Sequence, residues 1–591
     1  MTTTTSATSL LLFATSLFAA ANPPGNGYLL HNLVSDQPGV ADFTDKNLVN
    51  PWGIDTSATS PFWVNDGATG LSTVYSSNGA VSATLAIVPP GAKGPSTSVA
   101  TGIVSNLTGG FAVAVGRAPS FIFCTADGAI SGWASAVDAT HAQLMVDNSS
   151  KNAVYYGMAI SGRVASTTPQ IYVANFYSGA IEVYDTNYKP VTVSGGFTDP
   201  AVPAGYSPFN IQNIGGKLYV MYAKQNPGLR GWVNGAGLGH VAVFDLNGTL
   251  IKHLVSAGPL NAPWGVAIAG ANFGAFSGAL LIGNFGDGVI NAFDATSGNF
   301  LGALADPQGN TISIPGLWAL IPGNGGNGGD PNAIYFAAGE ASQNHGLLGS
   351  LQAAPVVASN AIGNAADTQA NIAPNTYISI FGANLSPVTR NWTNSDFSGT
   401  SLPKSLSGVS VTVNGKAAYV YYVSPKQIDV LTPVDTATGP VNVVVTSNGL
   451  TSATVSTTMQ AVSPAFFLLK DNKSIAALHA NSALVGATTL YANLSTPARA
   501  GETISLFGTG WGATTPAYTD GAIVAAPLPC AGAPTVTFGG ASAQVAYCGL
   551  ISSGVYQLNV VVPPTATAGD NVVTLTLGSS TSAGNAIITV Q

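Results

Sequence analysis

The sequence has few charged residues and no long hydrophobic run beyond its N-terminus. Only 7% of its 591 residues are Asp, Glu, Lys or Arg, and the formal net charge is −8. Without a basic patch, the composition excludes nucleic acid as a partner. A hydrophobic fraction of 46% argues against a disordered chain. No stretch of eighteen apolar residues follows the N-terminal region, so no membrane span is expected.

The N-terminus has the pattern of a secretion signal. Leu10–Ala20 is apolar but too short to cross a bilayer, and small residues follow at Ala19–Ala21. No Lys or Arg precedes this run. We expect residues 1–21 to be a signal peptide and the protein to be secreted, periplasmic or held at the cell surface.

Cysteine is also scarce, with three residues in the chain. The sequence has no CxxC or HExxH motif, so a zinc site is not indicated. Cys530 and Cys548 lie close together near the C-terminus, and an oxidising compartment would let them form a disulfide. Cys124 follows a strand-like run and is expected to be a buried thiol.

Short strand patterns that recur along the first half of the chain are the strongest signal. Asn261–Asp294 reads as three short strands separated by Gly, Asn and Asp. The same pattern appears at Asn50–Gly67 and again at Tyr156–Asp185. A unit repeated at roughly fifty-residue intervals is typical of a β-propeller.

Six repeats are predicted within residues 28–352, each starting where a strand would enter the central channel. Their first residues are Trp52, Phe111, Gly157, Phe209, Trp264 and Trp318. The sixth repeat is one strand short. We expect Tyr28–Val34 to supply that strand by pairing with His345–Leu351, which closes the ring and removes an exposed sheet edge.

The C-terminal part of the chain repeats itself once. Ile378–Gly382 matches Ile504–Gly508, and Gln427–Val430 matches Gln557–Val560. Short strands with regular turns predict immunoglobulin-like modules at residues 366–462 and 495–591, joined by a segment at 463–494. The predicted fold class is therefore all-β: a six-bladed β-propeller followed by two immunoglobulin-like β-sandwich modules.

Several motifs together resemble a known family. They are Asn175-Phe176, Tyr222–Gln225, Pro263-Trp264-Gly265, Gly283–Gly288 and His345-Gly346-Leu347. The set resembles exported bacterial proteins of unknown function related to NHL-repeat propellers, and the two C-terminal copies look like TIG-type immunoglobulin-like modules. Asn226–Gly239 has fewer acidic residues than the resemblance implies. The resemblance brings no established activity.

In a propeller, the loop that enters each innermost strand and the loop between the second and third strands share one face. This predicts a ligand-binding funnel of aromatic and polar residues, because aromatic rings supply contact area and polar groups supply orientation. The predicted funnel residues are Trp52, Asn65, Asp66, Asn175, Asn210, Lys224, Gln225, Trp264, Asn284, Asp287 and Trp318. The alternative is structural, since an aromatic residue can wedge between blades and an Asn or Asp can cap its own turn.

Two catalytic alternatives remain open at the same funnel. Asp66, Asp127 and Asp287 could bind calcium, which takes carboxylate ligands. His345 could act as a general base with Glu340 as its orienting partner. No other cofactor is indicated, and no GxSxG motif marks a nucleophilic serine.

The sequence favours a secreted or cell-surface binding or scaffold protein, whose extracellular ligand is a small molecule, a glycan or a protein. The rival hypothesis is a propeller hydrolase or lyase of the lactonase or esterase kind, with calcium as a candidate ion. Propellers host both classes, so the fold does not decide between them.

Overall fold

The computed structural model describes residues 27–162 and 168–591. The predicted signal peptide at 1–21 lies outside the described residues. The described chain forms two compact units, residues 27–353 and residues 354–591.

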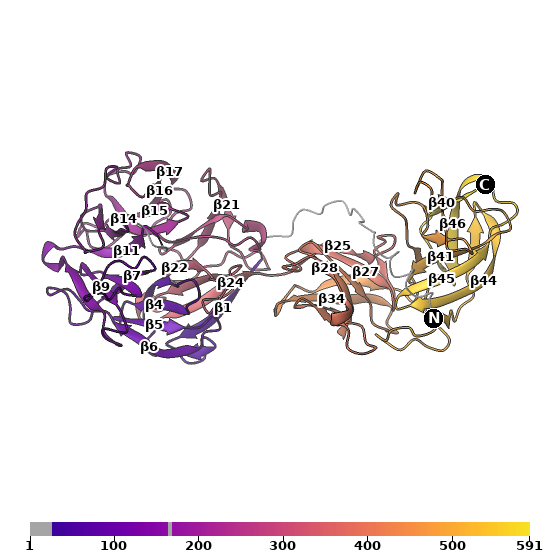
Figure 1. Ribbon diagram of the computed structural model, residues 1–591, viewed down its shortest axis with the longest axis horizontal. Coiled ribbons are helices and arrows are strands. Elements are labelled where there is room, and N and C mark those ends of the chain that lie inside the picture. The colour runs from indigo at the N-terminus through magenta and orange to yellow at the C-terminus, as the bar shows by residue number, and fades with distance from the viewer. Residues whose placement is uncertain (1–26, 163–167) are drawn as a thin grey trace. The chain divides into compact units, whose positions relative to one another are not determined.

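The first unit contains six sheets in its described residues (Figure 1). The first sheet has β3 (Pro51–Asp55), β4 (Phe62–Asp66), β5 (Leu71–Tyr75) and β6 (Val81–Ile87). The second has β7 (Ala100–Ser105), β8 (Phe121–Thr125), β9 (Ala129–Trp133) and β10 (Gln143–Asp147). The third has three strands, β11 (Tyr155–Ile160), β12 (Ile171–Asn175) and β13 (Ala180–Tyr184).

The remaining sheets follow the same order from the centre outward. The fourth has β14 (Tyr206–Ile214), β15 (Lys217–Lys224), β16 (Gly239–Phe244) and β17 (Leu250–Ser256). The fifth has β18 (Pro263–Ile268), β19 (Leu280–Asn284), β20 (Ile290–Phe293) and β21 (Phe300–Ala303). The sixth joins β22 (Leu317–Pro322), β23 (Ile334–Ala338) and β24 (Leu347–Ala353) to the N-terminal strands β1 (Tyr28–Ser35) and β2 (Phe43–Thr44).

The innermost strands form a closed ring. In the order β3, β7, β11, β14, β18 and β22, each contacts the next, and β22 contacts β3. The sixth sheet is completed by β1, which pairs antiparallel with β24 from Tyr28↔Ala353 to Ser35↔Leu347. The predicted closure by the N-terminal strand is therefore confirmed. This arrangement leaves no free edge on β24, in accord with the general need to protect sheet edges.

Each innermost strand carries a β-bulge near its start. The register with the second strand shifts between Pro51 and Ile54, and at the equivalent place in β7, β11, β14, β18 and β22. A bulge adds residues to one strand and re-aims its side chains. The residues inside the six bulges include Trp52, Thr101, Tyr156, Phe209, Trp264 and Trp318.

Glycine beside these bulges lets neighbouring innermost strands approach closely. A Cβ atom at Gly53 would lie 2.6 Å from the Thr101 carbonyl oxygen, and one at Gly265 would lie 2.6 Å from that of Trp318. Gly102 and Gly157 are crowded in the same way by the next strand of the ring. Real Cβ contacts do not become this short, so the ring closes only because these positions lack side chains.

The structure corrects the predicted start of the second repeat. The innermost strand is β7 (Ala100–Ser105), and Phe111 lies in the loop between β7 and β8. Phe111 is fully buried and contacts Tyr188 at a ring distance of 5.7 Å. The prediction failed because the bulge residue of this strand is Thr101, so no aromatic residue marks the repeat.

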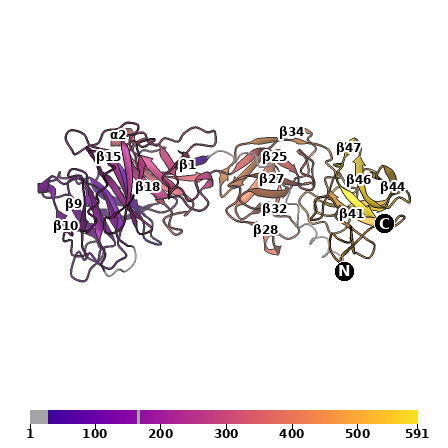
Figure 2. The same ribbon diagram turned by 90° about the horizontal axis from the view of Figure 1, so that it is seen from above.

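The second unit begins with a sandwich of two sheets that share one hydrophobic core. One sheet has the order β25 (Val356–Asn364), β27 (Tyr377–Ala383), β33 (Gln427–Leu431), β32 (Tyr419–Val423) and β28 (Arg390–Asn391) (Figure 2). The other has β26 (Asn371–Ile372), β36 (Val455–Met459), β34 (Gly439–Ser447), β30 (Val409–Val413) and β29 (Ser405–Leu406), with β31 (Lys416–Ala417) and β35 (Leu450–Thr451) at its sides.

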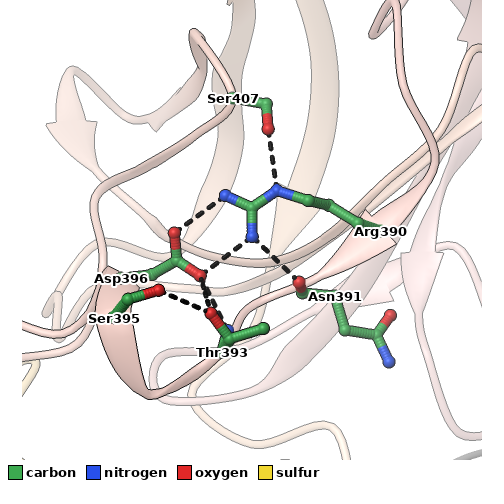
Figure 3. A network of polar contacts seen from close by, with 6 residues as sticks. All are labelled: Arg390, Asn391, Thr393, Ser395, Asp396 and Ser407. Atoms are coloured by element: carbon green, nitrogen blue, oxygen red, sulfur yellow. Dashed lines mark hydrogen bonds and ion pairs between the residues drawn. The ribbon is translucent and has the colours of Figure 1, made fainter.

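An arginine cluster fixes the loop after β28 (Figure 3). Arg390 binds both carboxylate oxygens of Asp396, at 2.8 and 2.9 Å, and donates through Nε to Ser407 Oγ. The Thr393 backbone N–H donates to the same carboxylate. These bonds hold the pKa of Asp396 below its usual range, first through the Arg390 hydrogen bonds. The groups are internal partners from β28, from the loop after it and, at Ser407, from the turn after β29, so the cluster is structural.

The last module builds one long sheet around a separate core. Its main strands are β41 (Thr503–Thr509), β45 (Val555–Val561), β44 (Ala541–Ser552), β43 (Thr535–Phe538), β46 (Gly569–Leu577) and β48 (Ile587–Val590). Its short strands are β37 (Ala465–Phe466), β38 (Ala477–Leu478), β39 (Leu484–Val485), β40 (Ser495–Thr496), β42 (Leu528–Pro529) and β47 (Ser580–Thr581).

Two sequence expectations meet the structure in this module. Cys530 and Cys548 form a disulfide. The segment 463–494, expected to be a connection, instead pairs β37 and β38 with β41 and so belongs to the second sandwich. Among the described residues, no helix has both the length and the apolar character needed to cross a bilayer.

Candidate functional site

The predicted funnel face is filled by aromatic side chains at the centre of the ring. Trp52 and Trp318 stack with centroids 3.4 Å apart, and Trp264 meets Trp318 edge-on at 5.8 Å. All three are at most 4% exposed. The bulges point these rings toward the ring axis. Trp52, Trp264 and Trp318 therefore fill the centre of the ring, and we call this cluster the plug.

Trp232 completes the plug and was not recognised from the sequence. It lies in the loop between β15 and β16, within the segment where more acidic residues were expected. Its ring is 4.8 Å from Phe209, 4.9 Å from Phe285 and 5.7 Å from Tyr156. The available signal was a lone tryptophan in a long loop rich in Gly and Asn.

Five of the eight predicted polar funnel residues are buried, and the four asparagines among them bind the backbone. Asn65 Nδ2 donates to the carbonyl oxygens of Thr101 and Gly102, which ties the first sheet to the second. Asn284 Nδ2 donates to Pro259 O at 2.8 Å. Asn175 accepts from Val154 N–H and donates to Glu182. These amides connect strands and loops, which agrees with the structural alternative.

Lys224, Gln225 and Asp287, at the loops between the second and third strands, lie nearer the surface. Lys224 is exposed at the end of β15. Gln225 Nε2 donates to the Phe176 carbonyl oxygen at 2.6 Å. Asp287 is exposed, and its carboxylate accepts from Val289 N–H and Asn261 Nδ2.

The three aspartates considered for calcium are not brought together. In the described residues, no group of three or more His, Cys, Asp or Glu side chains could hold a metal ion. Asp66 is buried and accepts from Thr73 Oγ1 at 2.8 Å. Burial raises its pKa well above the usual range, and nearby Asp45 adds to the effect. Asp127 instead accepts the Gly91 backbone N–H.

Glu340 is the first residue of a short helical turn, α2 (Glu340–Gln343), and His345 follows this turn. The carboxylate partner of His345 is Asp36, at 2.8 Å from Nδ1, and Asp36 also accepts the Gly346 N–H. Burial raises the pKa of Glu340, and the negative charge of Asp36 adds to this. The orienting acid predicted for His345 is thus replaced by one from the loop after β1.

An axial pocket lies on the opposite side of the plug. It has a volume of about 320 Å³ and is lined by residues of all six innermost strands; β18 contributes only Trp264, which lies in its bulge. Its apolar wall includes Ile54, Ile103, Val104, Met158, Ile160 and Leu320. Of the eleven predicted funnel residues, Asn210 and Trp264 line it. Near the axis, pockets of this size suit one small ligand.

The polar groups of the axial pocket are mostly amides. Gln212 is partly exposed, and its side-chain amide makes no hydrogen bond within residues 27–162 and 168–591. Asn213 donates to the carbonyl oxygens of Ile160 and Ser161. The Asp55 carboxylate accepts the Thr56 and Ser105 backbone N–H groups. The pocket therefore combines apolar side chains with polar side-chain and backbone groups and a free amide, a combination suited to an uncharged ligand.

A sequence signal for this pocket was present, but the pocket itself was not predicted. Glycine follows the bulge residue at Gly53, Gly102, Gly157 and Gly265, and apolar residues follow the glycine. That order places the small and apolar positions beyond the plug.

The fold and site define a β-propeller protein with an immunoglobulin-like C-terminal part. The model of the IPT/TIG domain matches residues 368–461. The second module, which lies after this match, repeats the same strand motifs.

Sequence relatives define the family more closely. The chain is 33% identical over 332 residues to Uncharacterized protein R648 of Acanthamoeba polyphaga mimivirus, covering 54% of this chain and 79% of that protein. It is 32% identical over 329 residues to Uncharacterized protein L690 of the same virus, covering 54% and 84%. The chain belongs to the family of these proteins. The expected bacterial, NHL-type character of the family stays a prediction.

Solved structures show only a distant likeness. A crystal structure of glucose dehydrogenase aligns at a TM-score of 0.34 and 12% identity, covering 55% of this chain and 99% of that one. The nidogen/laminin complex aligns at 0.29 and 13%, covering 47% and 82%. Scores this low carry no information on ligand or activity.

Proposed function

We propose that the protein is a secreted or cell-surface binding protein that holds a small uncharged molecule, or one end of an uncharged glycan, in the axial pocket. The supporting observation is the cavity of about 320 Å³ bounded by all six innermost strands, with the unpartnered Gln212 amide at its wall. Apolar contact supplies affinity, and a few polar groups orient the ligand.

We further propose that the C-terminal modules are spacers that carry the propeller. The IPT/TIG match supports this role for the first module, and the disulfide of the second suits an oxidising compartment. The exported, NHL-type character suggested by the sequence motifs belongs to the same proposal.

Binding is favoured over catalysis at this pocket because of its side chains. Among the described residues that line it there is no histidine. The single carboxylate among those lining residues, Asp55, accepts the Thr56 and Ser105 backbone N–H groups.

The test is a thermal-shift and calorimetric screen of the full chain against neutral mono- and oligosaccharides and small neutral heterocycles. A bound ligand at a hundred times its Kd adds about 2.7 kcal/mol to stability, which raises the Tm of the propeller. Gln212→Trp should fill the pocket and abolish the shift, because this side chain is partly exposed and holds no internal bond.

Lys217→Ala is the matched control, since Lys217 is exposed on the adjoining hairpin. It should bind as the unmodified protein does. Binding that survives Gln212→Trp, or that is lost in Lys224→Ala, would move the site to the corner face and contradict the proposal.

A further inference from the structure

The fourth sheet carries a Ser–His–Asp arrangement at its outer edge. His253 Nδ1 lies 2.6 Å from Asp199 Oδ2, and His253 Nε2 lies 2.6 Å from Ser256 Oγ. His253 and Ser256 are on β17, and Asp199 comes from the segment between β13 and β14.

A β-bulge brings the two β17 residues to one side. Residues three apart on a regular strand face opposite ways, because side chains alternate. Here the pairing of β16 with β17 passes from Val241↔Val255 to Ala242↔His253, which leaves Leu254 as an extra residue. The extra residue places Ser256 and His253 on the same face of β17, so that their side chains can contact each other.

The hydrogen bonds fix which ring nitrogen carries the proton. An ionised carboxylate only accepts, so Asp199 requires Nδ1–H on His253. In the neutral imidazole, Nε2 then offers its lone pair, and the Ser256 hydroxyl at 2.6 Å can donate to it. Asp199 Oδ1 accepts the Ala201 backbone N–H at 2.9 Å, which holds the carboxylate in place.

The exposure of the three side chains increases from the acid to the base to the nucleophile, as expected for such an arrangement. The side chain of Asp199 is 1% exposed and that of His253 is 18% exposed, while Ser256 is exposed. The acid is therefore shielded from water, and the hydroxyl can reach a substrate. Gly258 follows two residues later, and its backbone N–H makes no hydrogen bond to any described residue.

A second histidine packs beside the arrangement. His240 is opposite Ser256 in the strand pairing, and its ring lies 5.6 Å from that of His253. Burial lowers the pKa of His240, and the nearby His253 adds to this, while Asp199 opposes it. His240 therefore tends to stay uncharged and does not compete for the Asp199 carboxylate.

Another histidine of the protein provides an internal contrast. His479 Nδ1 contacts Glu502 at 2.6 Å, but its Nε2 faces both the Thr496 hydroxyl and the Thr496 carbonyl oxygen at 3.0 Å. A carbonyl only accepts, so it favours a proton on Nε2. Nε2 of His479 therefore has a carbonyl acceptor beside it as well as a hydroxyl. His253 faces a hydroxyl alone.

We propose that Ser256 is a nucleophile, with His253 as its general base and Asp199 as a positioning residue, for the hydrolysis of short-chain carboxylic esters such as acetyl esters. The site is on the outer strand and is separate from the axial pocket. An exposed hydroxyl leaves the alcohol portion of the ester in solvent, so acetyl groups on a larger molecule fit this position.

The reaction balances with water as the only co-reactant. Ser256 Oγ forms a bond to the ester carbonyl carbon while its proton passes to His253 Nε2. The C–O bond to the alcohol breaks, and the leaving alcohol takes that proton. Water then gives a proton to Nε2 and attacks the acyl-serine. The acid leaves, and the proton returns to Ser256.

The experiment treats the folded full chain with a fluorophosphonate probe, maps labelled peptides by mass spectrometry, and follows p-nitrophenyl acetate hydrolysis. Ser256 should be labelled, and Ser256→Ala should abolish both labelling and hydrolysis. His253→Gln should slow both by at least about a hundredfold. Ser297→Ala, at an exposed serine outside the arrangement, should behave as the unmodified protein.

Absence of label at Ser256, or hydrolysis unchanged in Ser256→Ala, would overturn the proposal and leave the three residues as a structural clip. If His253→Gln fails to fold, Ser256→Ala decides alone, since its side chain is exposed. Asp199→Asn should lower the labelling rate at temperatures well below its Tm, where the protein is still folded. A loss of Tm without a loss of rate would show a structural role only.

Discussion

At the residue scale, the two C-terminal modules differ by one informative substitution. Asp429 accepts hydrogen bonds from Ser379 Oγ and Gln427 Nε2. In the second module Asn559 accepts from Ser505 and Gln557 in the same way. The first module thus has an acid, Asp429, at the position where the second module has an amide, Asn559. Burial raises the pKa of Asp429 to about 6, although both hydrogen bonds lower it.

A raised carboxyl pKa predicts that stability falls as pH rises. Between about pH 4 and 6 the unfolded chain loses the Asp429 proton while the folded module keeps it. The folded state therefore binds more protons there, and the module loses about 3 kcal/mol of stability as the pH rises. Below pH 4 the acid is protonated in both states and no penalty remains. Asp429→Asn should therefore stabilise the module at pH 7 and have little effect at pH 4.

Hydrogen exchange of the β33 amides in the full chain measures this difference. Asn559→Asp is the reciprocal variant and should make the second module pH-dependent in the same direction. Equal protection of β33 in Asp429→Asn and the unmodified protein at pH 7 would contradict the prediction.

A second prediction at this scale concerns the crowded glycines. Gly265→Ala would bring a Cβ within 2.6 Å of the Trp318 carbonyl oxygen and 2.9 Å of the Leu320 side chain. Overpacking of this kind should lower the free energy of unfolding by about 1–3 kcal/mol. Gly228→Ala is the control, because only Asn226 Oδ1 lies within 4 Å, at 3.5 Å. Denaturant unfolding distinguishes the two, and equal midpoints would show that the ring tolerates the extra methyl.

At the element scale, β1 serves as the outer strand of the sixth sheet. Its Tyr28 hydroxyl donates to the Phe273 carbonyl oxygen, and the ring stacks on Phe276. A variant lacking residues up to Val34 should lose these contacts and expose β24. Calorimetry should show a large drop in the propeller Tm and an unchanged transition for residues 354–591. A variant that starts at Gly27 keeps β1 and is the control; a similar drop there would implicate the residues before the strand.

Strand patterns revealed the elements more reliably than the site. Alternating apolar residues and Gly, Asn or Asp turns predicted the sheets and the closing strand, since these depend on local sequence. The second sheet was misplaced because Thr101 occupies a bulge that is aromatic in every other innermost strand. The axial pocket was not predicted, because the aromatic residues at the bulges were interpreted as the walls of an open funnel, whereas the bulges turn their rings toward the axis. The Ser256 arrangement combines His253 and Ser256 with the distant Asp199, so no linear sequence motif indicates it.

At the scale of the whole molecule, covalent chemistry distinguishes the two units. Cys124 is fully buried in the propeller, and burial raises its pKa to about 12, so the folded chain should show no reactive thiol. Unfolding without reduction should release one thiol, and reduction should release two more. Three thiols in the unfolded, unreduced protein would contradict the Cys530–Cys548 bond.

The same disulfide predicts a local loss of stability. Cys530→Ser with Cys548→Ser should destabilise the last module by about 3 kcal/mol, since the bond closes a loop with a sequence separation of 18. The propeller transition should stay at its temperature in calorimetry. A shift of the propeller transition would mean that the two units do not unfold independently.

The closing strand also sets an order of events during synthesis. Tyr28 is among the first described residues to emerge, while its partner Ala353 is the last residue of the propeller unit. At 5–20 residues per second, roughly 15 to 60 seconds pass before the pair can form. During that interval β1 is an unpaired strand with no sheet to join. An exported chain that reaches its compartment unfolded avoids this wait, because both partners are then released together.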